Sequence, residues 1–147
     1  MALVYGQQRG DDRTKYAEQQ IFEKLYPAGP ARVSDNYFCN NANAAVRGGL
    51  WQELPYDKTL TGLEDLAWAK AVGQRGLCVV YQGGAAVVHV HDKSWRQVLN
   101  RYRREALALK KIAPEESFGL ADFIGCFIRN VVSDLRHAWR DGQLRAV

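Results

Sequence analysis

Few segments of this chain have the composition of a β-strand, and that scarcity limits the sheet it can form more than any other feature. The short apolar runs that suit strands are Ala2–Tyr5, Tyr37–Cys39, Leu77–Tyr81 and Ala85–His91. Helical patterns separate and follow them, an order typical of α/β proteins. These strands are too few for a complete doubly wound sheet. The sequence therefore predicts part of a larger sheet.

Glycines are expected to set the strand ends. Gly6 would end the first strand, and Gln82–Gly84 would form a turn between the last two. Those two strands could then be a hairpin or could lie apart in the sheet.

Five segments have the spacing or the end signals of helices: Lys15–Leu25, Ala44–Leu50, Leu63–Arg75, Ser94–Ile112 and Ser117–Trp139. Thr61 and Glu64 have the spacing of a capping box at the start of the third helix, and Gly76 suits its end. Ser94 suits the N-cap of the fourth. The chain then divides into an α/β unit over residues 1–113 and a C-terminal amphipathic helix within residues 114–147.

The last two helices carry apolar stripes. In the first of them Trp95 and Tyr102 fall on the stripe, which predicts that they belong to the core. The stripe of the last helix, from Leu120 to Trp139, is too long and regular to stay in water. We expect that helix to be peripheral. It would pack on another part of the full protein or lie on the cytoplasmic face of a membrane.

Composition bounds the class of protein. The chain has 147 residues, of which 47% are hydrophobic, enough for one domain with its own core. The net charge of +4 favours anionic partners without selecting one. Cys39, Cys78 and Cys126 are odd in number and far apart, so a reducing compartment is expected. No signal peptide or transmembrane segment is predicted, and the expected location is cytoplasmic.

Glu64 and Asp65 are candidate catalytic residues. Both fall in the first turn of a predicted helix, where the positive end of the helix dipole favours ionised carboxylates. A carboxylate in that position can accept a proton from a substrate hydroxyl. Acidic residues there are more often caps, and Glu64 fits the capping box. Asp65 is not needed for the box, so it is the better candidate for a general base.

Two further groups could bind ligands. His89 and His91 would lie on one face of a strand and could share a metal, or could simply be satisfied at a sheet end. Asn41 and Asn43 could bind sugar hydroxyls or could simply form a turn. A row of basic residues follows the histidines on the helix from Ser94. They form a solvated face or, as an alternative function, a nucleic-acid-binding face.

Taken in order, these pieces resemble glycosyltransferase family two, an A-type fold, and especially its bacterial rhamnosyltransferase-like members. The resemblance runs from about Leu3 to Lys111. It rests on five stretches: Val4–Gln8, the Asn-rich Phe38–Arg47, Leu54–Asp57, the Glu-Asp motif in Leu63–Ala69, and Val87–His91 with the helix that follows. Their order and spacing, more than any one of them, carry the match.

The resemblance implies a fold and a chemistry. The chain would be the acceptor-side, C-terminal half of an inverting, metal-dependent glycosyltransferase, with a partial mixed sheet and two long C-terminal helices. Asp65 would be the general base and Glu64 its support. Asn41, Asn43 and Arg47 would lie near the donor sugar. His89, or less favourably His91, would reach a divalent metal, Mn²⁺ or Mg²⁺, on the nucleotide diphosphate.

One departure from the family pattern decides what the chain can do alone. The Asp-x-Asp motif that holds the metal belongs to the nucleotide-binding half, and these residues contain none. We therefore expect an inactive fragment whose full enzyme moves sugar from a nucleotide-sugar to a glycan or lipid-linked acceptor in cell-surface polysaccharide synthesis. No nucleic-acid partner is expected in that case. The uncovered sheet edge and apolar surface predict self-association. The alternative is a small nucleic-acid-binding or metal-binding module.

Overall fold

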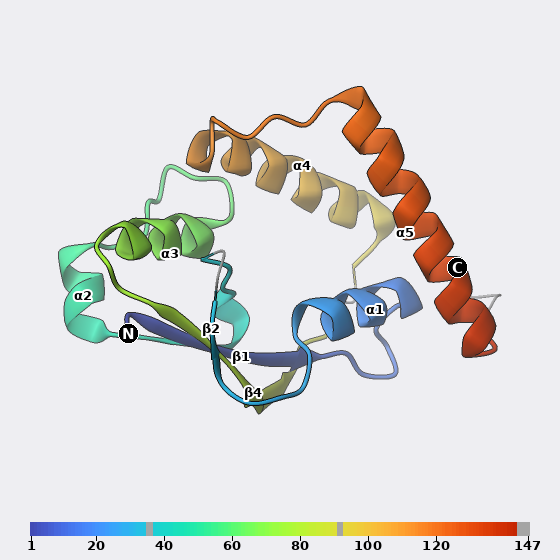
Figure 1. The fold of residues 1–147 in the computed structure, drawn as a ribbon, viewed down its shortest axis with the longest axis horizontal. Helices are drawn as coiled ribbons and strands as arrows, with labels where there is room; N and C mark the ends of the chain where they lie inside the picture. The colour runs from blue at the N-terminus through green and yellow to red at the C-terminus, as the bar shows by residue number, and fades with distance from the viewer. Residues whose placement is uncertain (35–36, 91–92, 144–147) are drawn as a thin grey trace.

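A four-stranded mixed sheet lies at the centre of the structure, a computed structural model that describes residues 1–34, 37–90 and 93–143 (Figure 1). Its strands are β1 (Leu3–Arg9), β2 (Arg32–Val33), β3 (Ala44–Val46) and β4 (Val79–Val88), in the order β2-β4-β1-β3. β1 and β4 are parallel, and the two edge strands are antiparallel to them. The expected α/β class with a mixed sheet is confirmed, and the family-specific fold stays a prediction.

The described helices are α1 (Tyr16–Leu25), α2 (Gly48–Glu53), α3 (Glu64–Gln74), α4 (Trp95–Ile112) and α5 (Leu120–Arg140), with a 3₁₀ turn, η1, over Asn41–Asn43. Four of them match the expected helices within three residues at each end. Gly76, with φ of +75°, follows α3 as expected, and Ser94 caps α4 in a capping box with Gln97. In Figure 1, α1, α3 and α4 all lie above the sheet, and α5 lies at one end of the molecule.

The segment from residue 37 to residue 53 differs from the prediction. Tyr37–Cys39 is not a strand, and the helix expected over Ala44–Leu50 is replaced by β3 and then α2. Ala44–Val46 pairs with β1, and the Arg47 N–H donates to the Ala2 carbonyl at 2.9 Å. Alanine is a good helix former, but pairing with a central strand satisfies the backbone and overrides that propensity.

The predicted turn at Gln82–Gly84 is also wrong. β4 is one strand that bends there, because three extra residues are inserted between the partners of Gly6 and Gln7. Gly6 does not end β1 either. A Cβ at Gly6 would lie 2.1 Å from the Ala85 carbonyl oxygen, so glycine is what lets the bulge close over β1.

The capping box expected at Thr61 and Glu64 does not form. Leu63 is the N-cap of α3, in the left-handed region with φ of 60°, and no side chain caps the helix. The Thr61 hydroxyl donates instead to the Arg104 carbonyl of α4 at 3.1 Å. A bulky residue in this conformation is strained and persists only where its surroundings hold it.

The core lies between the sheet and the helices on its upper face. Its buried members come from β1, β4, α1, α2, α3 and the adjoining loops: Ala2, Leu3, Tyr5, Phe22, Tyr26, Cys39, Leu50, Trp68, Ala69, Val72, Val79 and Tyr81. The Lys70 ammonium joins α3 to the end of α4 by donating to the Ile112 carbonyl and to Glu115. The first turn of α3 is therefore fixed against a packed layer.

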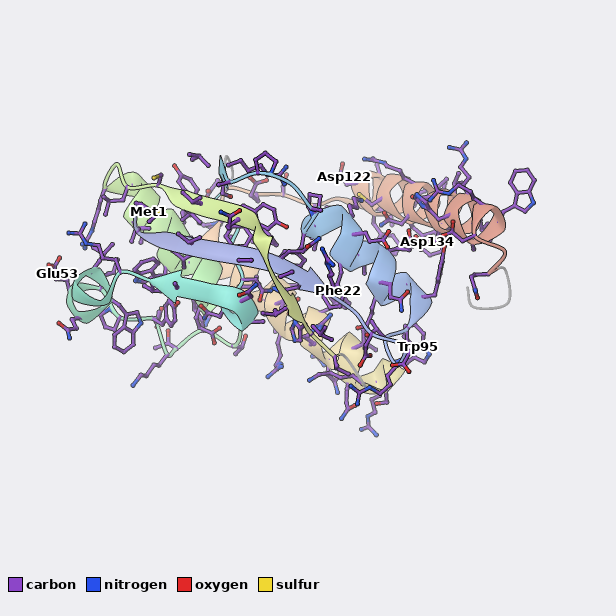
Figure 2. All side chains as sticks on the ribbon, turned by 90° about the horizontal axis from the view of Figure 1, so that it is seen from below. Met1, Phe22, Glu53, Trp95, Asp122 and Asp134 are labelled. Carbon is purple, nitrogen blue, oxygen red and sulfur yellow. The ribbon has the colours of Figure 1, made fainter. Side chains whose placement is uncertain are left out.

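The opposite face of the sheet carries a row of four apolar side chains. Val33, Val80, Val4 and Ala45 are partners in adjacent strands, so they line up across all four strands on one face. Val33 and Ala45 are exposed, and Val4 and Val80 are half-buried. Figure 2 views the sheet from this side, with the strands in front of α3 and α4. Both faces of a sheet in an α/β domain are usually covered.

The prediction that Trp95 and Tyr102 belong to the core is wrong. The Trp95 side chain is 69% exposed and Tyr102 is 45% exposed, and α4 buries Val98 and Ala108 instead. The buried positions lie on a neighbouring face of the same helix. Both aromatic side chains are therefore exposed on a helix rich in basic residues, and the nucleic-acid-binding alternative stays a prediction.

Candidate functional site

The Asp65 carboxylate is clamped to the turn that precedes β3. Its Oδ2 accepts from the Asn41 backbone N–H and its Oδ1 from the Leu66 backbone N–H, both at 2.9 Å. The Cys39 thiol donates to the Asp65 carbonyl oxygen at 3.2 Å. Three contacts therefore set the position of Asp65 relative to the core, and two of them come from a segment 24 to 26 residues away in the chain.

Burial raises the pKa of the Asp65 carboxyl above its ordinary value of 3.8. The hydrogen bonds from Asn41 and Leu66 oppose this effect, and the neighbouring Glu64 carboxylate adds to it. A carboxylate with a raised pKa is a stronger base, and it remains ionised at neutral pH unless the shift is very large. The raised pKa is compatible with a general-base role for Asp65, which stays a prediction.

We expect the Asp65 carboxyl carbon to titrate with a midpoint above 3.8 when followed by NMR in the 147-residue chain. The folded state then holds more protons than the unfolded chain in the window between the two pKa values. The contribution of Asp65 to stability is accordingly greatest when it is protonated, and it falls as the pH rises through the raised pKa. Asp57 is the internal control, because hydrogen bonds from Thr59 lower its pKa. A midpoint for Asp65 at or below that of Asp57 would contradict the buried placement.

A pocket of about 450 Å³ opens beside this clamp. It is lined by Asn41, Trp51, Pro55, Tyr56, Asp57, Lys58 and Glu64. The Tyr56 hydroxyl donates to the Asn41 side-chain oxygen at 2.7 Å, so the residue that holds Asp65 also forms the pocket wall. Glu64 lines the pocket, whereas Asp65 lies behind Asn41, and the catalytic roles of the two residues stay predictions.

Trp51 and Tyr56 give the pocket aromatic walls. Their ring centroids are 6.3 Å apart in an edge-to-face arrangement, and Tyr56 makes a similar contact with the buried Trp68 at 6.0 Å. The indole N–H of Trp68 donates to the Leu54 carbonyl, which fixes the loop that carries Tyr56. Aromatic faces beside amide and carboxylate groups are suited to a sugar ring, which has apolar C–H faces and a polar rim.

Asn43 and Arg47 lie outside that pocket lining. The Asn43 amide nitrogen donates to the Gln7 carbonyl at 3.1 Å and to the Ala85 carbonyl at 2.7 Å, so Asn43 ties β1 to the bulge of β4. Arg47 is exposed where β3 passes into α2. Their contact with a donor sugar stays a prediction.

His89 directly follows β4 and is held by β1 and α1. Its Nδ1 is hydrogen-bonded to the side-chain oxygen of Gln8, and its ring stacks on Phe22 with centroids 5.8 Å apart. An amide oxygen only accepts, so in this pairing Nδ1 is the donor. The role of His89 as a metal ligand stays a prediction. His91 lies outside the described residues.

Asp65 and His89 lie on the same side of the sheet but beside different pockets. Phe22 packs between His89 and Tyr26, with a centroid distance to Tyr26 of 6.2 Å. Burial raises the pKa of Tyr26, and the Asp65 carboxylate nearby adds to that rise. Gln8, Phe22 and Tyr26 line a second pocket of about 540 Å³. Two aromatic rings therefore stand between the candidate base and the candidate ligand.

The part of the chain that the structure describes does not fit a metal centre by itself, since it contains no group of three His, Cys, Asp or Glu side chains able to hold an ion. His89 could contribute one ligand to an ion held elsewhere.

Sequence reasoning missed Trp51, Tyr56 and Gln8 as site residues. Trp51 lies in the short helix α2 and Tyr56 in the loop that follows it. Their position beside Asn41 depends on the tertiary fold. Gln8 is 2% exposed and lies in β1, beyond the glycine that was predicted to end that strand. A buried glutamine beside a histidine at a strand end has no local sequence signal.

Comparisons of this chain with protein-family models, with curated proteins and with solved structures found no match.

Proposed function

We propose that the chain is the acceptor-side half of an inverting glycosyltransferase that moves a sugar from a nucleotide-sugar to a glycan or lipid-linked acceptor. The observation that carries the proposal is the Asp65 carboxylate, which accepts a hydrogen bond from Asn41, a residue that lines a pocket with aromatic walls. The resemblance to glycosyltransferase family two in the Glu-Asp stretch points to the same residue.

The chemistry assigned to Asp65 is removal of a proton from the acceptor hydroxyl. As the proton passes to the Asp65 carboxylate, the acceptor oxygen attacks the anomeric carbon of the donor. The bond from that carbon to the diphosphate oxygen breaks, and the diphosphate leaves with the electron pair. Attack opposite to the leaving group inverts the configuration at the anomeric carbon. The raised pKa of the Asp65 carboxyl favours transfer of the hydroxyl proton to it.

The pocket beside Asp65 supports an acceptor sugar as the occupant. Trp51 and Tyr56 offer ring faces and edges to the C–H surface of a pyranose, and Asp57, Lys58 and Glu64 offer partners to its hydroxyls. The Tyr56–Asn41–Asp65 series of hydrogen bonds would couple acceptor binding to the position of the base. We place the acceptor here and not beside His89, where the lining is chiefly glutamine, arginine and the edge of α1.

The open sheet face supports a further covering layer. The row from Val33 to Ala45 leaves four apolar side chains in line on the face opposite the helices. A nucleotide-binding half that packs there, and that carries the Asp-x-Asp motif, would complete the sheet and supply the donor site. In such an enzyme the charge of the leaving diphosphate is neutralised by Mn²⁺ or Mg²⁺. Without that half, the same row favours self-association.

The acceptor site can be tested in the 147-residue chain by NMR titration with methyl glycosides of hexoses and 6-deoxyhexoses. We expect weak binding that shifts the Trp51 indole N–H and the Asn41 backbone amide. The Trp95 indole, on α4, is the internal control and should not move. Trp51→Ala should abolish the shifts and leave the fold intact. Shifts confined to α4, or none for any glycoside, would contradict an acceptor pocket at Tyr56.

The same chain is expected not to bind a sugar nucleotide tightly or to hydrolyse it. Hard divalent ions favour carboxylate and phosphate oxygens, and His89 alone is a weak ligand for them. Calorimetric titration with a sugar nucleotide and Mn²⁺, together with a hydrolysis assay, measures this directly. Tight, metal-dependent binding would show that the donor site lies within these residues.

A further inference from the structure

Helix α5 is most buried near its C-terminal end. Ala138 is its buried residue, and Ser133, Asp134 and His137 nearby are half-buried. The Tyr16 hydroxyl of α1 donates to Asp141, just beyond the helix end, at 2.8 Å. An amphipathic helix on a globular domain usually buries its apolar stripe, whereas the large apolar side chains of α5 are exposed.

The apolar stripe of α5 is therefore exposed over its full length. The large side chains on it are Leu120, Phe123, Ile124, Phe127, Ile128, Val131, Val132, Leu135 and Trp139. Leu120 is 75% exposed and Trp139 is 76% exposed, so the exposure extends to both ends. At 1.5 Å per residue the 21-residue helix is about 31 Å long. Figure 1 shows α5 at the edge of the molecule, beyond α1.

Arginines adjoin this stripe on the solvent side. Arg129, Arg136 and Arg140 line a shallow groove together with Ile128 and Val132. The two aspartates of the helix do not line that groove. Asp122 accepts from the Gly119 N–H at the helix start, and Asp134 is half-buried. Cationic head groups therefore lie next to the apolar face.

We propose that α5 binds the surface of an anionic lipid bilayer, lying in the interface plane with its apolar stripe among the acyl chains. The arginines would extend to the lipid phosphates, and Trp139 would sit at head-group depth. A bilayer fits a continuous exposed stripe of this length without matched side chains, whereas a protein partner would have to supply acidic groups opposite three arginines. The described helices include none that is long and apolar enough to cross a membrane. This proposal stands apart from the proposed sugar transfer.

The test is co-sedimentation of the 147-residue chain with vesicles of 30% phosphatidylglycerol in phosphatidylcholine, compared with phosphatidylcholine alone. The chain should bind the anionic vesicles strongly and the neutral ones weakly, and added salt should weaken binding. Trp139 fluorescence should shift to the blue on binding, and Trp139→Phe should remove that shift.

Two substitutions distinguish the contribution of the apolar stripe to membrane binding from the contribution of charge. Phe127→Glu places a carboxylate on the apolar face and should lower the partition coefficient more than tenfold, while Asn130→Glu adds the same charge off the stripe and should lower it about fivefold or less. Replacing Arg129, Arg136 and Arg140 with Gln should cost on the order of 100-fold on anionic vesicles and little on neutral ones. Circular dichroism of each variant checks that the helices remain.

Sedimentation velocity without lipid tests whether a second copy of the chain, and not a bilayer, covers the stripe. A concentration-dependent dimer that Phe127→Glu abolishes, with no vesicle binding by the parent chain, would show that a second copy covers the stripe and would overturn the proposal. Equal losses for Phe127→Glu and Asn130→Glu would overturn it as well, because the stripe would then contribute nothing beyond charge.

Discussion

Asp65→Asn is expected to lower turnover by roughly 10²–10⁴-fold in an assembled enzyme that joins this chain to a nucleotide-binding half, the usual contribution of a general base. The amide keeps the shape of the side chain and can still accept one backbone hydrogen bond, from Asn41 or Leu66. It cannot take up the hydroxyl proton. Because the donor would bind elsewhere, the affinity for the sugar nucleotide should change little. Steady-state kinetics with varied donor and acceptor measures both effects.

Glu64→Gln is the matched control for that variant. Glu64 precedes Asp65 in the same helical turn and lines the pocket without belonging to the clamp. We expect a smaller loss, mostly in the KM for the acceptor. His89→Ala should instead weaken metal-dependent binding of the sugar nucleotide. A nearly normal turnover for Asp65→Asn, beside a large loss for Glu64→Gln, would transfer the base role to Glu64.

Gly6→Ala is expected to destabilise the chain by about 3 kcal/mol or more. Its Cβ would lie 2.1 Å from the Ala85 carbonyl oxygen and 2.4 Å from the Asn43 amide nitrogen. Overpacking of a tight core typically costs about 1–3 kcal/mol, and the bulge would also lose hydrogen bonds from Asn43 worth about 1 kcal/mol each. Urea denaturation measures the loss, which corresponds to a fall in Tm of about 10 °C.

Gly49→Ala is the control, because a Cβ at Gly49 meets nothing within 4 Å. Gly49 lies in α2, where alanine is favoured over glycine by up to about 1 kcal/mol. The control should therefore be neutral or stabilising. Equal stability of the two alanine variants would mean that β4 does not close over Gly6 as described.

The helices were predictable because their signals are local. Ser94 is the expected N-cap of α4 and forms a capping box with Gln97, and Gly76 takes a positive φ after α3, where it was expected to end the helix. Pro27 follows the C-cap residue of α1, and a proline there cannot continue the helix, which is also a local signal. In each case the decisive interaction joins residues within four positions of one another, so the sequence contains it directly.

The sheet was predicted less well because its pairing is not local. The alanines of β3 favour a helix on their own, and they become a strand only because β1 lies beside them. Gly6 and Gly84 look like stops, yet one of them lies inside β1 and the other inside the bulge of β4. A glycine that permits close approach and a glycine that ends a strand have the same local sequence pattern.

The candidate site shows the same difference between what local sequence predicts and what only tertiary contacts decide. The Glu-Asp pair at the start of a helix can be read from the sequence, and so can the long amphipathic stripe of α5. Only the tertiary structure decides that Asn41 and Cys39 hold Asp65, that Tyr56 faces the same pocket, and that the stripe of α5 points away from the domain. Those facts depend on contacts between segments 15 or more residues apart. Composition and periodicity determine which faces are apolar, whereas packing in three dimensions decides what each face meets.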